Sequence, residues 1–273
     1  MRIHRLDEVP FEKLMECFLE AFDGYFVKMP EDHDYYRERW KAAGVDYSWC
    51  FGISNGDKLA GFIIHAMGDK RKGLTAFNTG TGVIPAYRGR KLVNQIYQEA
   101  IPALKAGGIH RSQLEVISQN EKAIKAYERV GFKKEKHFIC VKGAFSSSLD
   151  ESFELRKVSP SEVPWSLFKD LELYSWDNQK STLEAGIHDY YLVYHEDELI
   201  GYFIHRPNRG VIHQLECLDK SETGWKRVLS AIKSITPEMR MLNIDNRLTD
   251  KLAYLELFGV SPYVEQYEMA MSF

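Results

Sequence analysis

The 273-residue sequence contains no run of about 18 apolar residues, so it predicts no membrane-spanning helix and no membrane partner. Its first ten residues, MRIHRLDEVP, lack the apolar core of a signal peptide. The formal net charge is -3, so no overall basic field is present. A nucleic-acid partner is therefore not expected.

Cysteine is also scarce. The four residues Cys17, Cys50, Cys140 and Cys217 lie far apart and form no CxxC pair. This spacing is typical of reduced, buried thiols in a cytoplasmic protein. The His, Cys, Asp and Glu residues show no metal-ligand spacing, so we expect no metal. The composition itself is globular, with 44% hydrophobic and 27% charged residues. The length allows one large domain or two of ordinary size.

Three short segments occur twice in the same order, which predicts an internal repeat. The pairs are EVPF (8–11) with EVPW (162–165), DKLAGFIIH (57–65) with DELIGYFIH (197–205), and, approximately, VGF (130–132) with FGV (258–260). The serine-rich stretch GAFSSSLDES at 143–152 is typical of a linker. We therefore predict two domains, residues 1–145 and 152–273.

Helix and strand patterns alternate in the first half. Apolar spacing predicts one helix within residues 8–22, started by Pro10 in its first turn, and another from Leu92 to Leu104 that Gly107-Gly108 ends. Pro102 should kink the second helix. An Asn-Gly turn predicts a hairpin over 47–68. A glycine-rich strand, a further strand and a helix ending in Gly131 follow. This order predicts an α/β (α+β layered) fold, in which each domain has a mixed, largely antiparallel sheet flanked by helices. The second half is expected to repeat it.

The stretch TGTGVIPAYRGRKL, residues 79–92, joins a glycine-rich strand to a helix through a proline and a basic turn. Glycines inside a strand indicate a bulge or a close approach by a ligand. Backbone N–H groups at a helix start, beside Arg88, Arg90 and Lys91, favour an anion such as pyrophosphate. Many helices begin with basic residues and bind nothing, so this stretch alone leaves the question open.

Together with LEVISQNEKAIKAYERVGF at 114–132, this stretch resembles the GNAT superfamily of N-acetyltransferases. In that family a V-x-P-x-Y-R-G-x-G-type turn holds the pyrophosphate of acetyl-CoA, and an N-x-x-A-x-x-x-Y-x-x-x-G-F pattern follows. Asn120, Ala123, Tyr127, Gly131 and Phe132 have that spacing. The resemblance implies an N-acetyltransferase that moves an acetyl group from acetyl-CoA to a primary amine.

The resemblance also implies which residues bind acetyl-CoA. They would be Val83, Ile84, Arg88, Gly89, Arg90, Lys91, Leu92, Val93 and Asn120. The family usually has glycine or alanine where this chain has Lys91 and Val93, so side chains narrow the loop there. A backbone N–H near Val83 would polarise the thioester carbonyl.

Two residues are candidates for catalysis. In the family the tyrosine at position 127 protonates the departing thiolate; packing in the core is the alternative, because Tyr127 lies on an apolar helix face. Asn120 would bond the pantetheine arm or cap the helix, in competition with Ser118. Glu115 alternates with its neighbours on a strand, so it either serves as the general base or pairs with a surface cation.

The acceptor site is the least defined part. In the family the segment after the first helix commonly forms one wall of the acceptor site. In this chain the corresponding residues 21–40 are aromatic and charged. Tyr25, Phe26, Tyr36 and, on the glycine-rich strand, Asn78 are candidates. The acceptor could be a small-molecule or peptide amine, and the chain could be a monomer or a homodimer.

The second half lacks a YRG counterpart, and Leu255 matches Tyr127 if FGV aligns with VGF. It is therefore predicted to be a degenerate GNAT-like domain that keeps the scaffold without the reaction. A non-catalytic acyl-CoA-binding protein and a pure scaffold are the alternatives for the whole chain.

Overall fold

The computed structural model describes residues 1–70, 73–207 and 209–273. They form two compact units. Unit 1 comprises Met1–Glu135 and Tyr267–Phe273, and unit 2 comprises Lys136–Gln266. All four cysteines are buried, and none of them forms a disulfide within the described residues. Among the described helices, none is long and apolar enough to cross a membrane.

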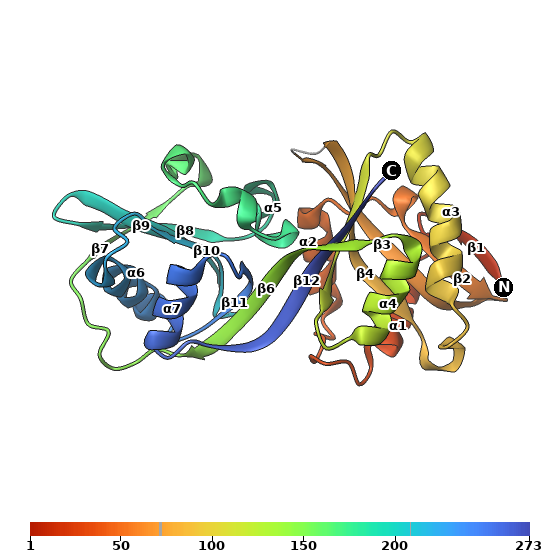
Figure 1. Cartoon of the computed structure of the whole chain (residues 1–273), viewed down its shortest axis with the longest axis horizontal. Helices are drawn as coiled ribbons and strands as arrows, with labels where there is room; N and C mark the ends of the chain where they lie inside the picture. The colour runs from red at the N-terminus through yellow and green to blue at the C-terminus, as the bar shows by residue number, and fades with distance from the viewer. Residues whose placement is uncertain (71–72, 208) are drawn as a thin grey trace. The chain divides into compact units, whose positions relative to one another are not determined.

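Unit 1 is a sheet with helices on both faces (Figure 1). Its strands follow the order β1 (Arg2–Arg5), β2 (Phe51–Asn55), β3 (Lys58–Lys70), β4 (Gly73–Val83), β5 (Arg111–Ile117) and β12 (Ser261–Ser272). Its helices are α1 (Phe11–Phe22), α2 (His33–Ala43), α3 (Leu92–Ala106) and α4 (Glu121–Val130), with 3₁₀ turns η1 (Tyr47–Trp49) and η2 (Pro85–Tyr87). β1 to β4 pair antiparallel, and β4 pairs parallel with β5. One core lies under α1 and α2, and another under α3 and α4.

Helix α2 was not assigned from the sequence. Asp32 caps it by accepting the N–H groups of Asp34 and Tyr35, and Gly44 ends it in the left-handed region. Tyr36 and Trp40, one turn apart, are both buried in the core with α1. Tyr36 is 0% exposed, which favours packing in the core over a place in the acceptor site.

Unit 2 has the same kind of sheet. Its strands follow the order β12, β6 (Lys133–Ala144), β11 (Glu238–Asp245), β10 (Val211–Cys217), β9 (Glu198–Arg206), β8 (Asp189–His195) and β7 (Glu154–Val158). Its helices are α5 (Lys180–Ala185), α6 (Glu222–Ile235) and α7 (Thr249–Leu257), with 3₁₀ turns η3 (Pro160–Glu162), η4 (Trp165–Leu167), η5 (Leu171–Leu173) and η6 (Trp176–Asn178).

The repeat predicted from the sequence is present from the hairpin onward. The hairpin β8–β9 corresponds to β2–β3, α6 to α3, and α7 to α4. The expected first helix of the second half is absent. Residues 160–178 form four 3₁₀ turns instead. This segment contains Pro160 and Pro164 together with serine and aspartate, which favour turns over a helix interior.

Each unit takes a strand from the other half of the sequence. In unit 2, Phe138–Ala144 of β6 pairs antiparallel with β11. In unit 1, the end of β12 contributes Met269 to the core that contains Tyr127 and Phe132. The N–H of Phe273 also donates to the His110 carbonyl at 2.9 Å. The units therefore do not follow the predicted boundaries 1–145 and 152–273, and the linker-like stretch 143–152 lies within unit 2.

Residues 1–145 expressed alone should not fold, because they lack the strand that closes the sheet and core of unit 1. The same segment joined to residues 261–273 by a flexible glycine-serine linker should recover a cooperative thermal transition. Near-UV circular dichroism and thermal unfolding of the two proteins test this. A cooperative transition of residues 1–145 alone would contradict the strand exchange.

Candidate active site

The parallel strands β4 and β5 separate part-way along their length. Thr75–Asn78 pair with Arg111–Leu114, but β4 continues to Val83 and β5 to Ile117. Beyond Asn78, β4 bulges: Ile64 pairs with Gly80 and His65 with Asn78, which leaves Thr79 as the extra residue. The bulge predicted from the glycines is confirmed. Because one extra residue resets the alternation of side chains, Asn78 and Thr81 lie on the same face.

Asn78 is the centre of a buried hydrogen-bond network on that face. Its Nδ2 donates to Thr81 Oγ1 at 2.6 Å and to the Tyr97 hydroxyl at 2.8 Å. Its Oδ1 accepts from the Gly80 N–H at 3.1 Å. Because a backbone N–H can only donate, the orientation of the Asn78 amide is fixed by this contact. The network thereby ties α3, which carries Tyr97, to the bulge.

Helix α4 brings Tyr127 to the same network. The helix begins at Asn120, whose Oδ1 accepts the Ala123 N–H at 3.2 Å, so the capping role of Asn120 is confirmed. Tyr127 is 8% exposed and packs edge-on against Tyr97, which bonds Asn78. Burial raises the pKa of Tyr127 to about 12, and the polar side chains of Thr81 and Asn78 oppose that shift. The hydroxyl is therefore protonated at neutral pH.

Tyr25 reaches this cluster from the segment between α1 and α2. It packs edge-on against Phe22 at 5.0 Å. Burial raises the pKa of Tyr25, and the polar side chain of Asn120 opposes that shift. Tyr25 is close enough to Tyr127 to raise the pKa of that residue as well. The structure thus brings together Tyr25, Asn78, Asn120 and Tyr127, which lie on separate segments of the sequence.

The other two candidates lie at the margins of the cluster. Glu115 follows the last paired residue of β5, and its neighbours Leu114 and Val116 are buried under α3 and α4. The carboxylate therefore lies on the opposite face of the sheet. Phe26 is 52% exposed and packs against Tyr25. Their proposed roles stay predictions.

The turn between β4 and α3 fits an anionic group. Gly89 and Lys91 have φ values of 77° and 57°, and α3 starts directly afterwards with no side-chain cap and no acidic residue in its first turn. The backbone N–H groups of that first turn have no partner within the helix, and the helix dipole is positive there. Arg90 and Lys91 are exposed on this turn. A diphosphate would find backbone donors and two cations.

Arg88 is used for a different purpose. Its Nε donates to the Val83 carbonyl at 3.2 Å and its Nη2 to the Ala21 carbonyl at 3.1 Å. The N–H of Ile84 donates to the Ala60 carbonyl at 3.0 Å. Arg88 therefore fixes the end of β4 to the end of α1, although it stays exposed. Arg90 is also exposed; it lies over the Tyr87 ring and its Nη2 donates to the Ala86 carbonyl at 3.5 Å.

Lys91 adopts a left-handed conformation where the family resemblance leads one to expect glycine. Such a conformation costs a non-glycine residue about 1–2 kcal/mol. Lys91→Gly should therefore raise the free energy of unfolding of unit 1 by about 1 kcal/mol relative to Lys91→Ala, since both remove the same charge but only glycine relieves the strain. Chemical denaturation of the two variants measures the difference. Equal stability would contradict the strain.

Comparisons with known proteins agree with this geometry. Residues 11–132 match the model described as the Acetyltransferase (GNAT) family. This segment is similar to the GNAT acetyltransferase family. The matched range contains every residue of the cluster around Tyr127 as well as the turn before α3. Members of the GNAT family use acyl-CoA.

Individual relatives extend the comparison. Over 89 residues the chain is 33% identical to N-alpha-acetyltransferase MAK3 of Arabidopsis thaliana, a match that covers 32% of this chain and 47% of that protein. The chain thus spans about half the length of that relative.

Solved structures match the whole chain. A putative acetyltransferase from Pyrococcus horikoshii matches 100% of this chain and 89% of its own at a TM-score of 0.70 and 16% identity. A tandem GNAT protein from the clavulanic acid biosynthesis pathway matches 99% and 98% at a TM-score of 0.66 and 10% identity. At such identities the likeness shows the fold alone. The whole chain has the mixed α/β fold of tandem GNAT proteins.

The two halves can be matched residue by residue at their last helices. The Phe132 N–H donates to the Tyr127 carbonyl, and the Val260 N–H donates to the Leu255 carbonyl in the same way. This equivalence confirms that Leu255 occupies the position of Tyr127. It also places Leu248 at the position of Asn120 and Lys251 at that of Ala123. Unit 2 therefore has neither the tyrosine nor the asparagine of unit 1.

In unit 2, polar side chains lie where β10 leaves β11. These strands share the single pair Val211–Arg240. The Tyr174 hydroxyl lies 2.9 Å from the Leu215 carbonyl oxygen and 3.3 Å from its N–H. Lys251 Nζ lies 2.7 Å from Glu216 Oε1 and 3.0 Å from the Tyr174 hydroxyl.

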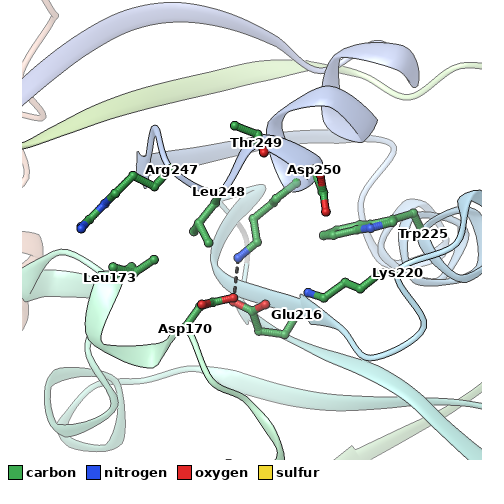
Figure 2. Close-up of a pocket in the computed structure, with 10 residues that line it drawn as sticks. Asp170, Leu173, Glu216, Lys220, Trp225, Arg247, Leu248, Thr249 and Asp250 are labelled. Atoms are coloured by element: carbon green, nitrogen blue, oxygen red, sulfur yellow. Dashed lines mark hydrogen bonds and ion pairs between the residues drawn. The ribbon is translucent and has the colours of Figure 1, made fainter.

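A pocket of about 360 Å³ opens beside this ion pair (Figure 2). Asp170 and Asp250 give its wall negative charge, while Lys220 and Arg247 give it positive charge. Arg247 is already paired with Asp245 at 2.6 Å. Burial lowers the pKa of Lys251, and Glu216 opposes that shift.

Loss of the buried cation should destabilise unit 2. In Lys251→Met the Glu216 carboxylate stays buried without its ammonium partner, which typically costs about 3–5 kcal/mol. Adding Glu216→Gln should restore most of the stability, and Lys220→Met at the exposed wall of the same pocket is the matched control. Denaturant unfolding followed by the tryptophan fluorescence measures all three. A Lys251→Met protein as stable as the control would show that the pair is not buried as described.

Proposed function

We propose that unit 1 transfers the acetyl group of acetyl-CoA to a primary amine. The observation that carries this proposal is the position of Tyr127. Its protonated hydroxyl lies where β4 and β5 separate, on the face where α3 begins with an uncapped, basic turn. A cosubstrate that carries both a thioester and a diphosphate requires both features: a proton donor for the thioester sulfur and an anion site for the diphosphate.

The turn before α3 supports the diphosphate end. Gly89 and the backbone N–H groups of Leu92 and Val93 would donate to it, and Arg90 and Lys91 would add positive charge. Arg88 would position the backbone at the end of β4, because its Nε donates to the Val83 carbonyl. The backbone of Val83 and Ile84 lies along the path from this turn to the Tyr127 cluster. An N–H near Val83 would polarise the thioester carbonyl.

Tyr127 supports the chemical step. The amine nitrogen attacks the acyl carbon, the carbon–sulfur bond breaks, and the electron pair stays on sulfur. Tyr127 Oη would give its proton to that sulfur, which is favourable because a thiolate gains a bond to the donor as charge develops. The proton lost from the amine would pass to water or to Glu115.

The acceptor is a small-molecule or peptide amine, and Tyr25, Phe26 and Asn78 are proposed to line its site. A peptide with a free α-amine is the first acceptor to test, because the relative with 33% identity is named an N-alpha-acetyltransferase. The four free cysteines support a cytoplasmic location. Neither a metal nor a nucleic acid enters the proposal, and the chain would act as a monomer or homodimer.

Unit 2 is proposed to be a scaffold for unit 1 rather than a second enzyme. Lys251 stands where unit 1 has the small Ala123, and its ammonium group pairs with the buried Glu216 carboxylate. The chain of unit 2 continues into β12, whose end completes the sheet of unit 1, so unit 2 has a structural role.

Release of free thiol from acetyl-CoA, measured with a panel of peptides, amino acids and polyamines, tests the proposed reaction. We expect turnover with at least one amine. Tyr127→Phe should lower kcat about 100-fold or more with little change in the KM for acetyl-CoA, because a general acid typically contributes 10²–10⁴-fold.

Tyr263→Phe in unit 2 is the matched control and should leave kcat unchanged. Tight binding of acetyl-CoA without turnover on any amine would favour the alternative of a non-catalytic acyl-CoA-binding protein. Absence of binding would favour a scaffold.

A further inference from the structure

The pocket in unit 2 contains buried hydrogen-bonding groups that the protein itself does not use. Glu216 lines this pocket and is 3% exposed. Its Oε1 accepts from the Tyr174 hydroxyl and from Lys251 Nζ, each at 2.7 Å. Its other oxygen, Oε2, has no hydrogen-bond partner within residues 1–70, 73–207 and 209–273. Because buried polar atoms are normally hydrogen-bonded, Oε2 is an acceptor for a molecule that enters the pocket.

Lys251 has a donor to spare in the same place. Its side chain is 3% exposed and lines the pocket. An ammonium group has three hydrogens, and the acceptors that the structure describes are Glu216 Oε1 at 2.7 Å and the Tyr174 hydroxyl at 3.0 Å. Helix α7 adds further donors, since it begins at Thr249 with no side-chain cap, and the N–H groups of its first turn have no partner within the helix. The pocket therefore presents an unused acceptor beside unused donors.

The charges around the pocket favour a ligand that carries both signs. The charged residues that line it are three acids and three bases, namely Asp170, Glu216, Asp250, Lys220, Arg247 and Lys251. A ligand with negative charge alone would face the three carboxylates. One with positive charge alone would face the three cations and the positive end of α7. A zwitterion places a complementary charge against each set, which is the arrangement that electrostatic complementarity favours.

Size and the remaining surface narrow the class further. The other large side chains of the lining are Leu173, Leu248 and Trp225, which are mainly apolar (Figure 2). The Trp225 ring stacks on Tyr254 at 5.6 Å, so it is held in place as one wall. The volume of about 360 Å³ is near the lower end of the range for ligand pockets, about 300–1,000 Å³. It suits a molecule of amino-acid size rather than a long cosubstrate such as an acyl-CoA.

We propose that this pocket binds a free α-amino acid with an apolar side chain. The ammonium group of the ligand would donate to Glu216 Oε2 and lie near Asp170. Its carboxylate would accept from Lys251 Nζ and from the first turn of α7. Because Glu216 and Lys251 are in direct contact, their unused groups are adjacent, as the two charges of an α-amino acid are. Leu255 occupies the position of Tyr127 in this unit, so the amino acid is bound there without being acetylated.

Calorimetric titration of L-leucine into the full chain is the test, with L-methionine and L-phenylalanine as further probes. We expect one molecule per chain for at least one of the three. The matched probes for leucine are 4-methylpentanoate, which lacks the ammonium group, and 3-methylbutylamine, which lacks the carboxylate. Each should bind at least about tenfold more weakly than leucine, because it loses bonds to a charged partner. Binding of either truncated probe as tightly as the amino acid would overturn recognition of a zwitterion, and no binding of any amino acid at millimolar concentration would overturn the site.

Two variants locate the binding within unit 2. The double variant Lys251→Met with Glu216→Gln, which is expected to keep most of the stability, should lower the affinity for the amino acid at least about tenfold. Its matched control is Lys226→Met with Glu222→Gln, which makes the same changes in an ion pair of α6 outside the pocket and should leave the affinity unchanged.

Asp170→Asn keeps the buried pair intact and should also weaken binding, so the proposal stays testable if the double variant does not fold. Thermal unfolding of each protein shows whether it is folded. Affinity unchanged in Asp170→Asn and in a folded double variant would place the amino acid elsewhere on the chain and overturn the proposal. Calorimetry reports binding whether or not unit 1 acetylates an amine, so this outcome is independent of the proposed function.

Discussion

The separation of β4 from β5 beyond Asn78 is the constraint on which the rest of unit 1 depends. A parallel pair that diverges leaves a gap that the sheet cannot fill with its own hydrogen bonds. The bulge at Thr79 turns polar side chains of β4 toward α3 and α4. Tyr127 enters the same space from α4, and Tyr25 reaches it from the segment after α1. The turn before α3 and the acid candidate are thereby parts of one geometric feature.

Unit 2 has the same divergence between β10 and β11, with a different content. Tyr174 bonds the main chain of Leu215, and Lys251 pairs with Glu216 beside a pocket of about 360 Å³. Unit 2 thus keeps the fold of unit 1, although it has neither the tyrosine nor the asparagine that would contact a thioester cosubstrate. The strand exchange gives a physical reason for keeping this second copy, because unit 1 has no complete sheet without β12.

Much of the site could be predicted because its residues lie in two short motifs. Spacing alone put Asn120 and Tyr127 on one helix, and the glycines of 79–82 indicated the bulge. Thr81 and Tyr97 were missed, because their roles depend on which face the bulge turns them to, and one extra residue reverses that face. Had the bulge been assigned to Thr79, the pairing of Asn78 with Thr81 would have followed.

The fold was predictable to the level of a tandem mixed α/β architecture, now matched by structures that cover the whole chain. The exchange of β6 and β12 was not, since strands of either half have the same alternation and pairing partners are set by contacts distant in sequence. Arg88 was expected to face a phosphate, but its guanidinium bonds two carbonyls of unit 1. The sequence of a motif does not reveal whether a basic side chain already donates to groups of the protein itself.

The central claim is that the chain has one acyl-CoA site, at the turn before α3 in unit 1. Calorimetric titration of acetyl-CoA into the full chain tests it most directly. The account predicts one site per chain, with affinity lowered at least tenfold when Arg90→Ala and Lys91→Ala are combined. Two sites per chain, or a single site unaffected by these substitutions, would contradict it.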